Sequence, residues 1–128
     1  MRRRALSLLL PLAAVAACAA PGAPIRDDVF FTADSALLDD AARTVINRVA
    51  ASARANPNAP VRVRGFAAPD TGTATFNRTL SQARAQAVAD ALVGAGVPNT
   101  RVTVEASGGV AFTATPTESR RVEIVIGG

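Results

Sequence analysis

The 128-residue chain contains no histidine, tryptophan or tyrosine, and only one cysteine. Without histidine it lacks both the usual general base of nucleophilic triads and the commonest metal ligand. One cysteine cannot form an internal disulfide. No acidic group has the spacing of a metal site or of paired catalytic carboxylates. We therefore expect no enzyme activity, no metal and no cofactor.

The charge balance argues against nucleic acid as a partner. The formal net charge of +4 comes from 14 basic and 10 acidic residues. Three of the arginines are Arg2, Arg3 and Arg4, so the rest of the chain carries 11 arginines against 10 acidic residues. Five phenylalanines are the only aromatic residues. Neither a concentrated basic surface nor a set of stacking groups is evident, and we expect no nucleic-acid binding.

The first 17 residues have the pattern of an export signal. Three arginines precede an apolar run over 5–12, which is too short to span a bilayer, and a stretch of small residues follows. Residues 15–17, Val-Ala-Ala, stand directly before Cys18 and resemble the lipobox of bacterial lipoproteins. That resemblance implies cleavage before Cys18 and acylation of its thiol and new amino terminus. The alternative is an ordinary signal peptide with an incidental cysteine.

These features divide the chain into three parts. We predict a lipoprotein signal peptide at 1–17, a lipidated N-terminus and short Ala/Pro/Gly-rich linker at 18–27, and a folded domain at 28–128. A domain of this size can bury one modest core.

Hydrophobic periodicity within the domain predicts the order β-α-β-α-β-β. Strands with alternating or apolar patterns are expected at 28–32, 61–66, 101–106 and 120–126. A first amphipathic helix is expected after a Ser35 cap and ends at 56–60, and a second covers 76–92, with Gly96 as a left-handed cap. The predicted fold is α+β, a two-layer sandwich in which two helices cover one face of a mixed four-stranded sheet. Its other face is partly wet.

One side of the second predicted helix carries an unusual set of polar residues. Asn77, Ser81 and Arg84 are spaced by four and three, so they line up along the border of the apolar stripe. An arginine beside an apolar stripe needs acceptors for its five donors. Those acceptors are either an acidic side chain and loop carbonyls of the same domain, or a ligand carboxylate.

Several segments resemble the OmpA-like C-terminal domain found in peptidoglycan-associated lipoproteins. They are "VFFTADSALL", "NRTLSQARAQAVADAL", "GVPNTRV" and "SRRVEIVI". The family's central pattern, Asn, two residues, Leu-Ser, two residues, Arg-Ala, is matched from Asn77 through Leu80 to Arg84. The likeness covers about residues 28–126.

The resemblance implies non-covalent binding of peptidoglycan through the diaminopimelate of its stem peptide. Asn77, Leu80 and Arg84 would belong to the site, with Arg84 meeting a ligand carboxylate. The family's Gly-His-Thr-Asp segment is replaced here by Gly-Phe-Ala-Ala at 65–68, and Asp70 is the only nearby carboxylate. Asp70 either binds the ligand ammonium or merely forms a turn.

The combined expectation is an outer-membrane lipoprotein that faces the periplasm and holds the membrane to the cell wall. Its partners would be the peptidoglycan stem peptide, the membrane through the lipid on Cys18, and other envelope proteins. Asp34 and Ser35 lie in the first loop, beside the same pocket in the family. The alternative is an interaction lipoprotein that keeps the fold, has a degenerate peptidoglycan site and binds a protein partner.

Overall fold

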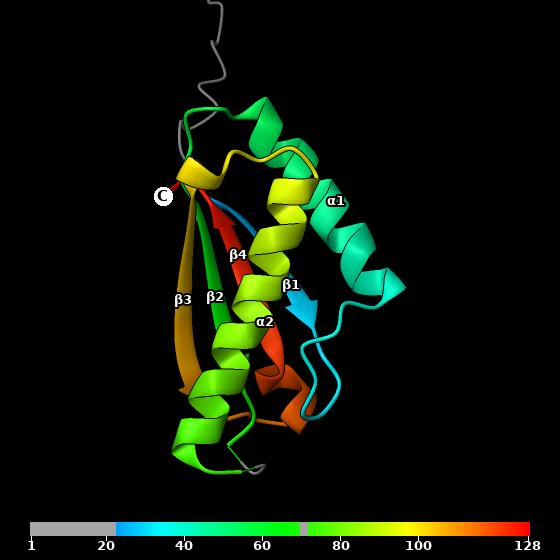
Figure 1. The fold of residues 1–128 in the computed structure, drawn as a ribbon, viewed down its shortest axis with the longest axis vertical. Coiled ribbons are helices and arrows are strands. Elements are labelled where there is room, and N and C mark those ends of the chain that lie inside the picture. The colour runs from blue at the N-terminus through cyan, green and yellow to red at the C-terminus, as the bar shows by residue number, and fades with distance from the viewer. Residues whose placement is uncertain (1–22, 70–71) are drawn as a thin grey trace, which may run out of the picture.

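The computed structural model describes residues 23–69 and 72–128, which form a two-layer α+β sandwich (Figure 1). The predicted signal peptide, Cys18 and Asp70 lie outside these residues. The sheet contains β1 (Ile25–Phe30), β2 (Val61–Ala67), β3 (Val102–Gly109) and β4 (Arg121–Ile126). The helices are α1 (Asp40–Ala55) and α2 (Ala74–Gly94), with short 3-10 turns at Asn99–Arg101 and Pro116–Ser119.

The sheet has the strand order β1-β4-β2-β3. Strands β2 and β3 are parallel, while β4 runs antiparallel to both β1 and β2. Both helices lie over the same face of the sheet, as Figure 1 shows. The predicted fold class, element order and one-sided helix packing are confirmed.

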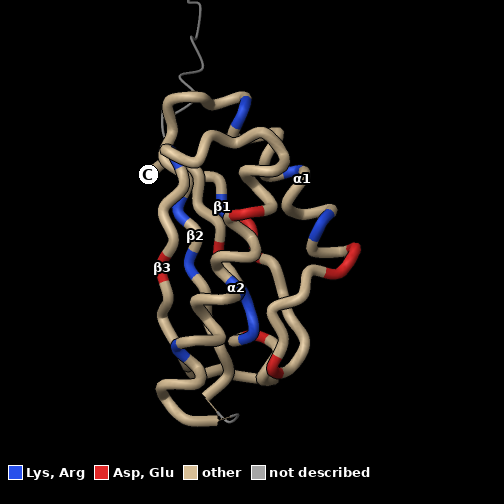
Figure 2. The backbone as a smooth tube through the Cα atoms, in the orientation of Figure 1, with Lys and Arg blue, Asp and Glu red and all other residues tan. Residues whose placement is uncertain are grey.

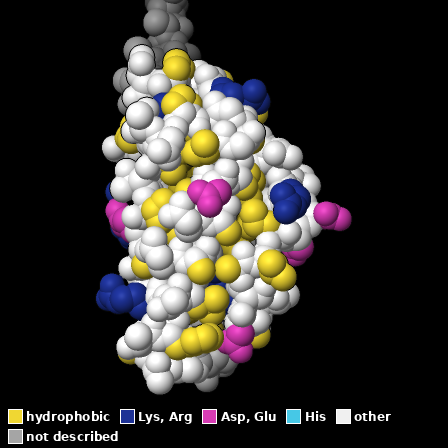
Figure 3. Space-filling view, in the orientation of Figure 1, with side chains coloured by type: hydrophobic (Ala, Val, Ile, Leu, Met, Phe, Trp, Pro, Cys, Tyr) yellow, Lys and Arg dark blue, Asp and Glu magenta, His cyan; other side chains and the backbone are white. Residues whose placement is uncertain are grey.

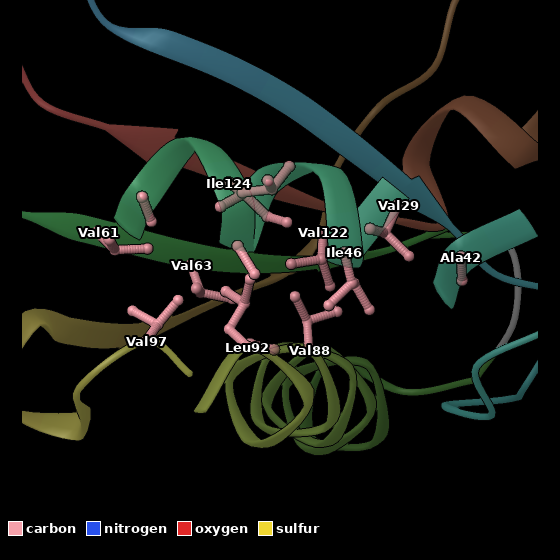
Figure 4. Close-up of a cluster of buried hydrophobic side chains, with 14 of the residues drawn as sticks. Val29, Ala42, Ile46, Val61, Val63, Val88, Leu92, Val97, Val122 and Ile124 are labelled. Atoms are coloured by element: carbon pink, nitrogen blue, oxygen red, sulfur yellow. The ribbon is translucent and has the colours of Figure 1, made fainter. Parts of the chain in front are cut away.

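The core lies between the helices and the sheet (Figure 4). Val88 and Leu92 of α2 point toward Val63 of β2 and Val122 of β4, and all four side chains are fully buried. The valines of β2 alternate with exposed Arg62. The period-two alternation in β2 therefore separates a buried face of the sheet from a solvent-exposed face, as the sequence predicted.

Two local predictions need correction. Strand β1 begins at Ile25, three residues before the predicted start and inside the segment expected to be a linker, because its backbone pairs with β4 from Ile126 onward. The cap of α1 is Asp39 rather than Ser35: Ala42 N donates to Asp39 Oδ1 at 2.7 Å. The Ser35 hydroxyl instead accepts from Leu37 N within the loop.

Helix α2 also differs slightly from its predicted form. It begins at Ala74, where Thr73 Oγ1 accepts from Phe76 N. Phe76, expected on the apolar stripe, is 44% exposed. Gly96 follows the helix with φ +101°, so the predicted left-handed cap is confirmed.

Candidate ligand site around Arg84

Arg84 is fully buried, although it carries a charge and lies on a helix that faces the sheet edge and loops. Its Nε donates to Ser35 O at 2.7 Å, Nη2 to Thr32 O at 3.0 Å and Nη1 to Phe66 O at 3.0 Å. The guanidinium therefore ties the β1–α1 loop to the end of β2. These loop carbonyls are one of the two kinds of acceptor that the sequence left open.

No carboxylate lies within ion-pairing distance of Arg84 among the described residues. The Arg84 Cζ atom lies 5.3 Å from the centroid of the Phe31 ring, which adds a cation–π contact. Burial, together with the nearby charge of Arg120 and against the opposing charge of Asp34, lowers the pKa of the Arg84 guanidinium to about 10. The group remains charged at neutral pH, and its charge is only partly compensated.

Asp34 is the acidic residue whose charge raises the pKa of Arg84. It is exposed, and it has φ +53°, the only positive φ of a described residue other than glycine. Asp tolerates this left-handed conformation better than most residues do. The carbonyls that flank it, from Thr32 and Ser35, are both bound by Arg84. The loop therefore presents a carboxylate to solvent while its backbone is held by the buried arginine.

Ser81 and Gly65 set the distance between α2 and the sheet. A Cβ atom on Gly65 would lie 1.9 Å from the Ser81 carbonyl oxygen, so only glycine allows this approach. The buried Ser81 hydroxyl donates to Arg78 O at 2.8 Å and accepts from Gly108 N at 2.9 Å, which joins α2 to β3. Ser81 is thus a structural link and has no free hydroxyl for nucleophilic chemistry.

Asn77 is the least satisfied polar side chain of the predicted set. It is 3% exposed, and its Oδ1 has no hydrogen-bond partner in the described part of the chain. It lines a cavity of about 340 Å³ together with Arg78, the end of β3 and the segment that leads into α2. Buried amides are normally paired, so this one is available to a partner outside the domain.

Leu80 and Asp70 are the other residues predicted to bind peptidoglycan. Leu80 is 9% exposed and is one of the buried residues of α2. The family's Thr and Asp positions are occupied by Ala67 and Ala68, which are both buried. No structural statement is possible for Asp70, which lies outside the described residues. Asn77, Leu80 and Arg84 thus lie on one helix in different surroundings, and their roles in ligand binding, like those of Asp70 and Cys18, stay predictions.

The sequence did not reveal that carbonyl groups would hold Arg84. Thr32 and Phe66 contribute through their backbones, and backbone contacts leave no residue-type signal. The Phe66 side chain lies on the face of the sheet that is opposite the helices. There, Arg121 Cζ is 4.4 Å from the centroid of the Phe66 ring. Phe66 therefore replaces the family's histidine with a residue whose ring turns away from Arg84.

Two further features of residues 23–69 and 72–128 concern metal binding and membrane spanning. In this part of the chain, no three or more His, Cys, Asp and Glu side chains are grouped so as to hold a metal ion. The helices described there include none with the length and apolar character needed to cross a membrane.

The fold is a two-layer α+β domain with a buried arginine, and sequence comparison gives its family. Residues 30–123 match the OmpA family model, and the chain belongs to the OmpA family. It is 39% identical over 114 residues to the peptidoglycan-binding protein ArfA of Mycobacterium tuberculosis, a match that covers 84% of this chain and 33% of ArfA. It is 41% identical over 80 residues to outer membrane protein 40 of Porphyromonas gingivalis, covering 62% of this chain and 21% of that protein. The matches thus span a third or less of these relatives.

Solved structures agree with this assignment. The peptidoglycan-associated lipoprotein from Burkholderia pseudomallei has 25% sequence identity and a TM-score of 0.71, over 77% of this chain and 88% of that one. The C-terminal domain of Helicobacter pylori MotB has 24% identity and a TM-score of 0.71, over 80% and 84% of the two chains. The MotB likeness concerns the fold alone.

Proposed function

We propose that this protein is an outer-membrane lipoprotein whose OmpA-like domain binds peptidoglycan non-covalently and so tethers the membrane to the cell wall. Binding rather than catalysis is the proposed activity. Two of the proteins to which the chain is similar, ArfA and the Burkholderia lipoprotein, have peptidoglycan in their names. The recognised group would be the diaminopimelate of the stem peptide, which carries an ammonium and a carboxylate on one carbon.

The observation that carries this proposal is the charge of Arg84, which is buried and only partly compensated. The guanidinium group of Arg84 has five N–H donors, and it binds three backbone carbonyls rather than a carboxylate. A ligand carboxylate would supply the missing counter-charge in a bidentate geometry that arginine favours. Because Arg84 has no exposed surface, the ligand can reach it only if part of the 32–35 loop moves aside.

Asn77 supports the same proposal from the N-terminal end of α2. Its unpaired Oδ1 can accept from an amide or ammonium, and the cavity that it lines adjoins the start of the helix. The helix N-terminus adds a partial positive charge that favours an anion. Leu80 lies between these two residues in sequence and would contribute apolar packing. Asp70 is the proposed partner of the ligand ammonium.

The placement of this site relative to the termini fits a tether. Figure 1 shows that the start of β1 and the C-terminus lie at the same end of the sheet. The loops around Arg84 lie at the opposite end (Figure 1). Helix α2, with 21 residues, runs between the two ends and is about 30 Å long. A lipid on Cys18 would therefore hold one end at the membrane and leave the other free to face the wall.

A second function is favoured by one specific observation. Buried alanines stand at the positions of the family's Thr and Asp, and Arg84 is closed off by its own loop. A domain with these changes could have lost wall binding and kept the fold for a protein partner in the envelope. The two functions predict opposite results in one assay.

That assay is co-sedimentation of residues 19–128 with purified sacculi that contain diaminopimelate, with free diaminopimelate as competitor. We expect binding that the competitor abolishes. The matched variants are Asn77→Ala, expected to weaken binding, and Asn47→Ala, on the exposed side of α1 and expected to bind like the parent. Absence of binding by the parent chain would favour the protein-partner function.

Anchoring is tested separately in cells. Cys18→Ser should release the protein in soluble form or leave its signal uncut. A processed Cys18→Ser protein that stayed on the outer membrane would contradict the lipoprotein assignment.

A further inference from the structure

The end of the domain at which β1 begins carries several exposed basic residues. The first two residues of β1, β2 and β3 and the last two of β4 lie in register at this end, and they include Arg26 and Arg62. The connections at this end, residues 56–60 and 95–101, contain no Asp or Glu. Arg54 adds a further cation from the last turn of α1. We call Arg26, Arg54 and Arg62 the basic end.

The opposite end carries acidic side chains, which the connections at 56–60 and 95–101 lack. Its loops contain Asp34, Asp39 and Glu118, together with Arg120. Glu118 is engaged by its own loop, because the N–H groups of Thr113 and Ala114 donate to its carboxylate and lower its pKa. Figure 2 shows acidic segments around the start of α1, and Figure 3 shows no acidic side chain beside the N-terminal end on the face in view. The two ends therefore differ in where acidic side chains lie, while basic side chains are present at both.

The three arginines of the basic end have no partner of their own. All three are exposed, and within the described part of the chain none makes a side-chain hydrogen bond or ion pair. Arg26 and Arg62 both lie opposite Val125 on the central strand β4, one on each side. They line a cavity of about 170 Å³ with Arg64, Glu105 and Glu123, and these two carboxylates are already paired with Arg64 and Arg121. Adjacent strands are about 4.8 Å apart, so these arginines can reach one anion together.

Chain length limits what can meet this surface. Six residues separate Cys18 from Ile25, and a fully extended segment of this length spans at most about 25 Å. A lipid on Cys18 would therefore keep the basic end close to the membrane surface. Ile25, which is 40% exposed, adds an apolar group beside Arg26.

We infer that the basic end docks on anionic phospholipid headgroups of the membrane to which the chain is anchored. Arg26, Arg54 and Arg62 contact the phosphates, and this contact orients the long axis so that the loops around Arg84 face away from the membrane. The inference rests on the proposed function only for the lipid on Cys18. Each arginine near an anionic surface contributes about 1 kcal/mol, equivalent to about a five-fold change in the docking equilibrium.

The test supplies the anchor chemically, through the single cysteine. The chain from residue 18 to 128 contains the whole core cluster, from Val29 to Ile126, and is coupled through Cys18 to a maleimide-headgroup lipid in vesicles. Vesicles contain either phosphatidylcholine alone or phosphatidylcholine with 30% phosphatidylglycerol, where the percentage is about that of an anionic leaflet. Arginine modification by phenylglyoxal is followed at each residue by mass spectrometry.

On anionic vesicles, Arg26, Arg54 and Arg62 should react several-fold more slowly than on neutral ones, while exposed Arg43 and Arg78 should react equally on both. The pair Arg26→Gln and Arg62→Gln should remove the protection of Arg54. The matched pair Arg43→Gln and Arg78→Gln, with the same net charge, should preserve it.

Three outcomes would overturn the inference. The first is that the three arginines react equally fast on both kinds of vesicle. The second is that both paired variants lose the protection of Arg54 equally. The third is that millimolar inorganic phosphate, at matched ionic strength, protects the three arginines as fully as anionic vesicles do. The last would indicate a site for a free anion. None of these results depends on peptidoglycan, so wall binding can fail while docking holds, and the reverse.

Discussion

Two arginines of this domain hold backbone carbonyls in nearly the same way, at opposite ends of the fold. Arg84 binds the carbonyls of Thr32, Ser35 and Phe66, and Arg101 binds those of Ala53, Asn56 and Ala59. Arg101 is partly exposed and closes the C-terminal end of α1, a common role for a basic side chain. Arg84 is fully enclosed.

The difference between the two arginines teaches that carbonyl contacts alone do not define a ligand site. Arg101 keeps access to water, so its charge requires no further partner. Arg84 has lost that access and has only Phe31 and a distant Asp34 to offset its charge. The enclosed arginine therefore combines a structural role with the capacity to attract an anion.

The largest expected effect is that of Arg84→Ala. It removes three bonds from a charged donor and leaves a cavity in the layer between loop and sheet, so the free energy of unfolding should fall by about 3 to 5 kcal/mol. Chemical denaturation measures this. A loss below about 1 kcal/mol would contradict the structural role.

Gly65→Ala tests the packing that holds Arg84 in place. The new Cβ would meet the Ser81 carbonyl oxygen, so α2 must shift, and we expect a loss of about 2 to 3 kcal/mol in the free energy of unfolding. Gly94→Ala is the matched control, because a Cβ on Gly94 meets no atom within 4 Å. Equal melting temperatures for the two variants would show that the close approach is unimportant.

Arg101→Ala should have a smaller effect than Arg84→Ala. Its carbonyl partners can be hydrated by solvent after truncation, and the expected loss is about 1 to 2 kcal/mol in the same denaturation assay. Sacculus binding should not change, because Arg101 lies at the opposite end from the candidate site. If Arg101→Ala were as destabilising as Arg84→Ala, burial would not be the feature that separates them.

The smallest effect is expected for Asn77→Leu, and its sign is opposite. Replacing a buried, unpaired amide by an apolar group of similar size should raise the free energy of unfolding by up to about 1 kcal/mol. The same variant should weaken sacculus binding. A variant that is less stable and binds normally would show that Asn77 has a structural role.

The sequence by itself determined the fold class and the residues that share a helix side. The alternation of valines and arginines in β2 sets one buried and one exposed face of the strand. The four- and three-residue spacing aligns Asn77, Ser81 and Arg84 along one side of α2. Both patterns could be predicted because they depend only on the local period of the backbone. The family pattern around Arg84 led to the same fold, which the OmpA family match confirms. The roles of Asp70 and Cys18 stay predictions.

Only the tertiary structure decided what surrounds these residues. Capping of α1 by Asp39 instead of Ser35 depends on how the preceding loop is held, and that loop is held by Arg84 from 49 residues away. The acceptors of Arg84 are backbone carbonyls, which every residue type carries, so no sequence pattern identifies them. The grouping of Arg26 with Arg62 likewise arises because the sheet topology brings separate segments to the same end. Local periodicity thus specifies the elements, while long-range packing determines burial, partners and charge environment.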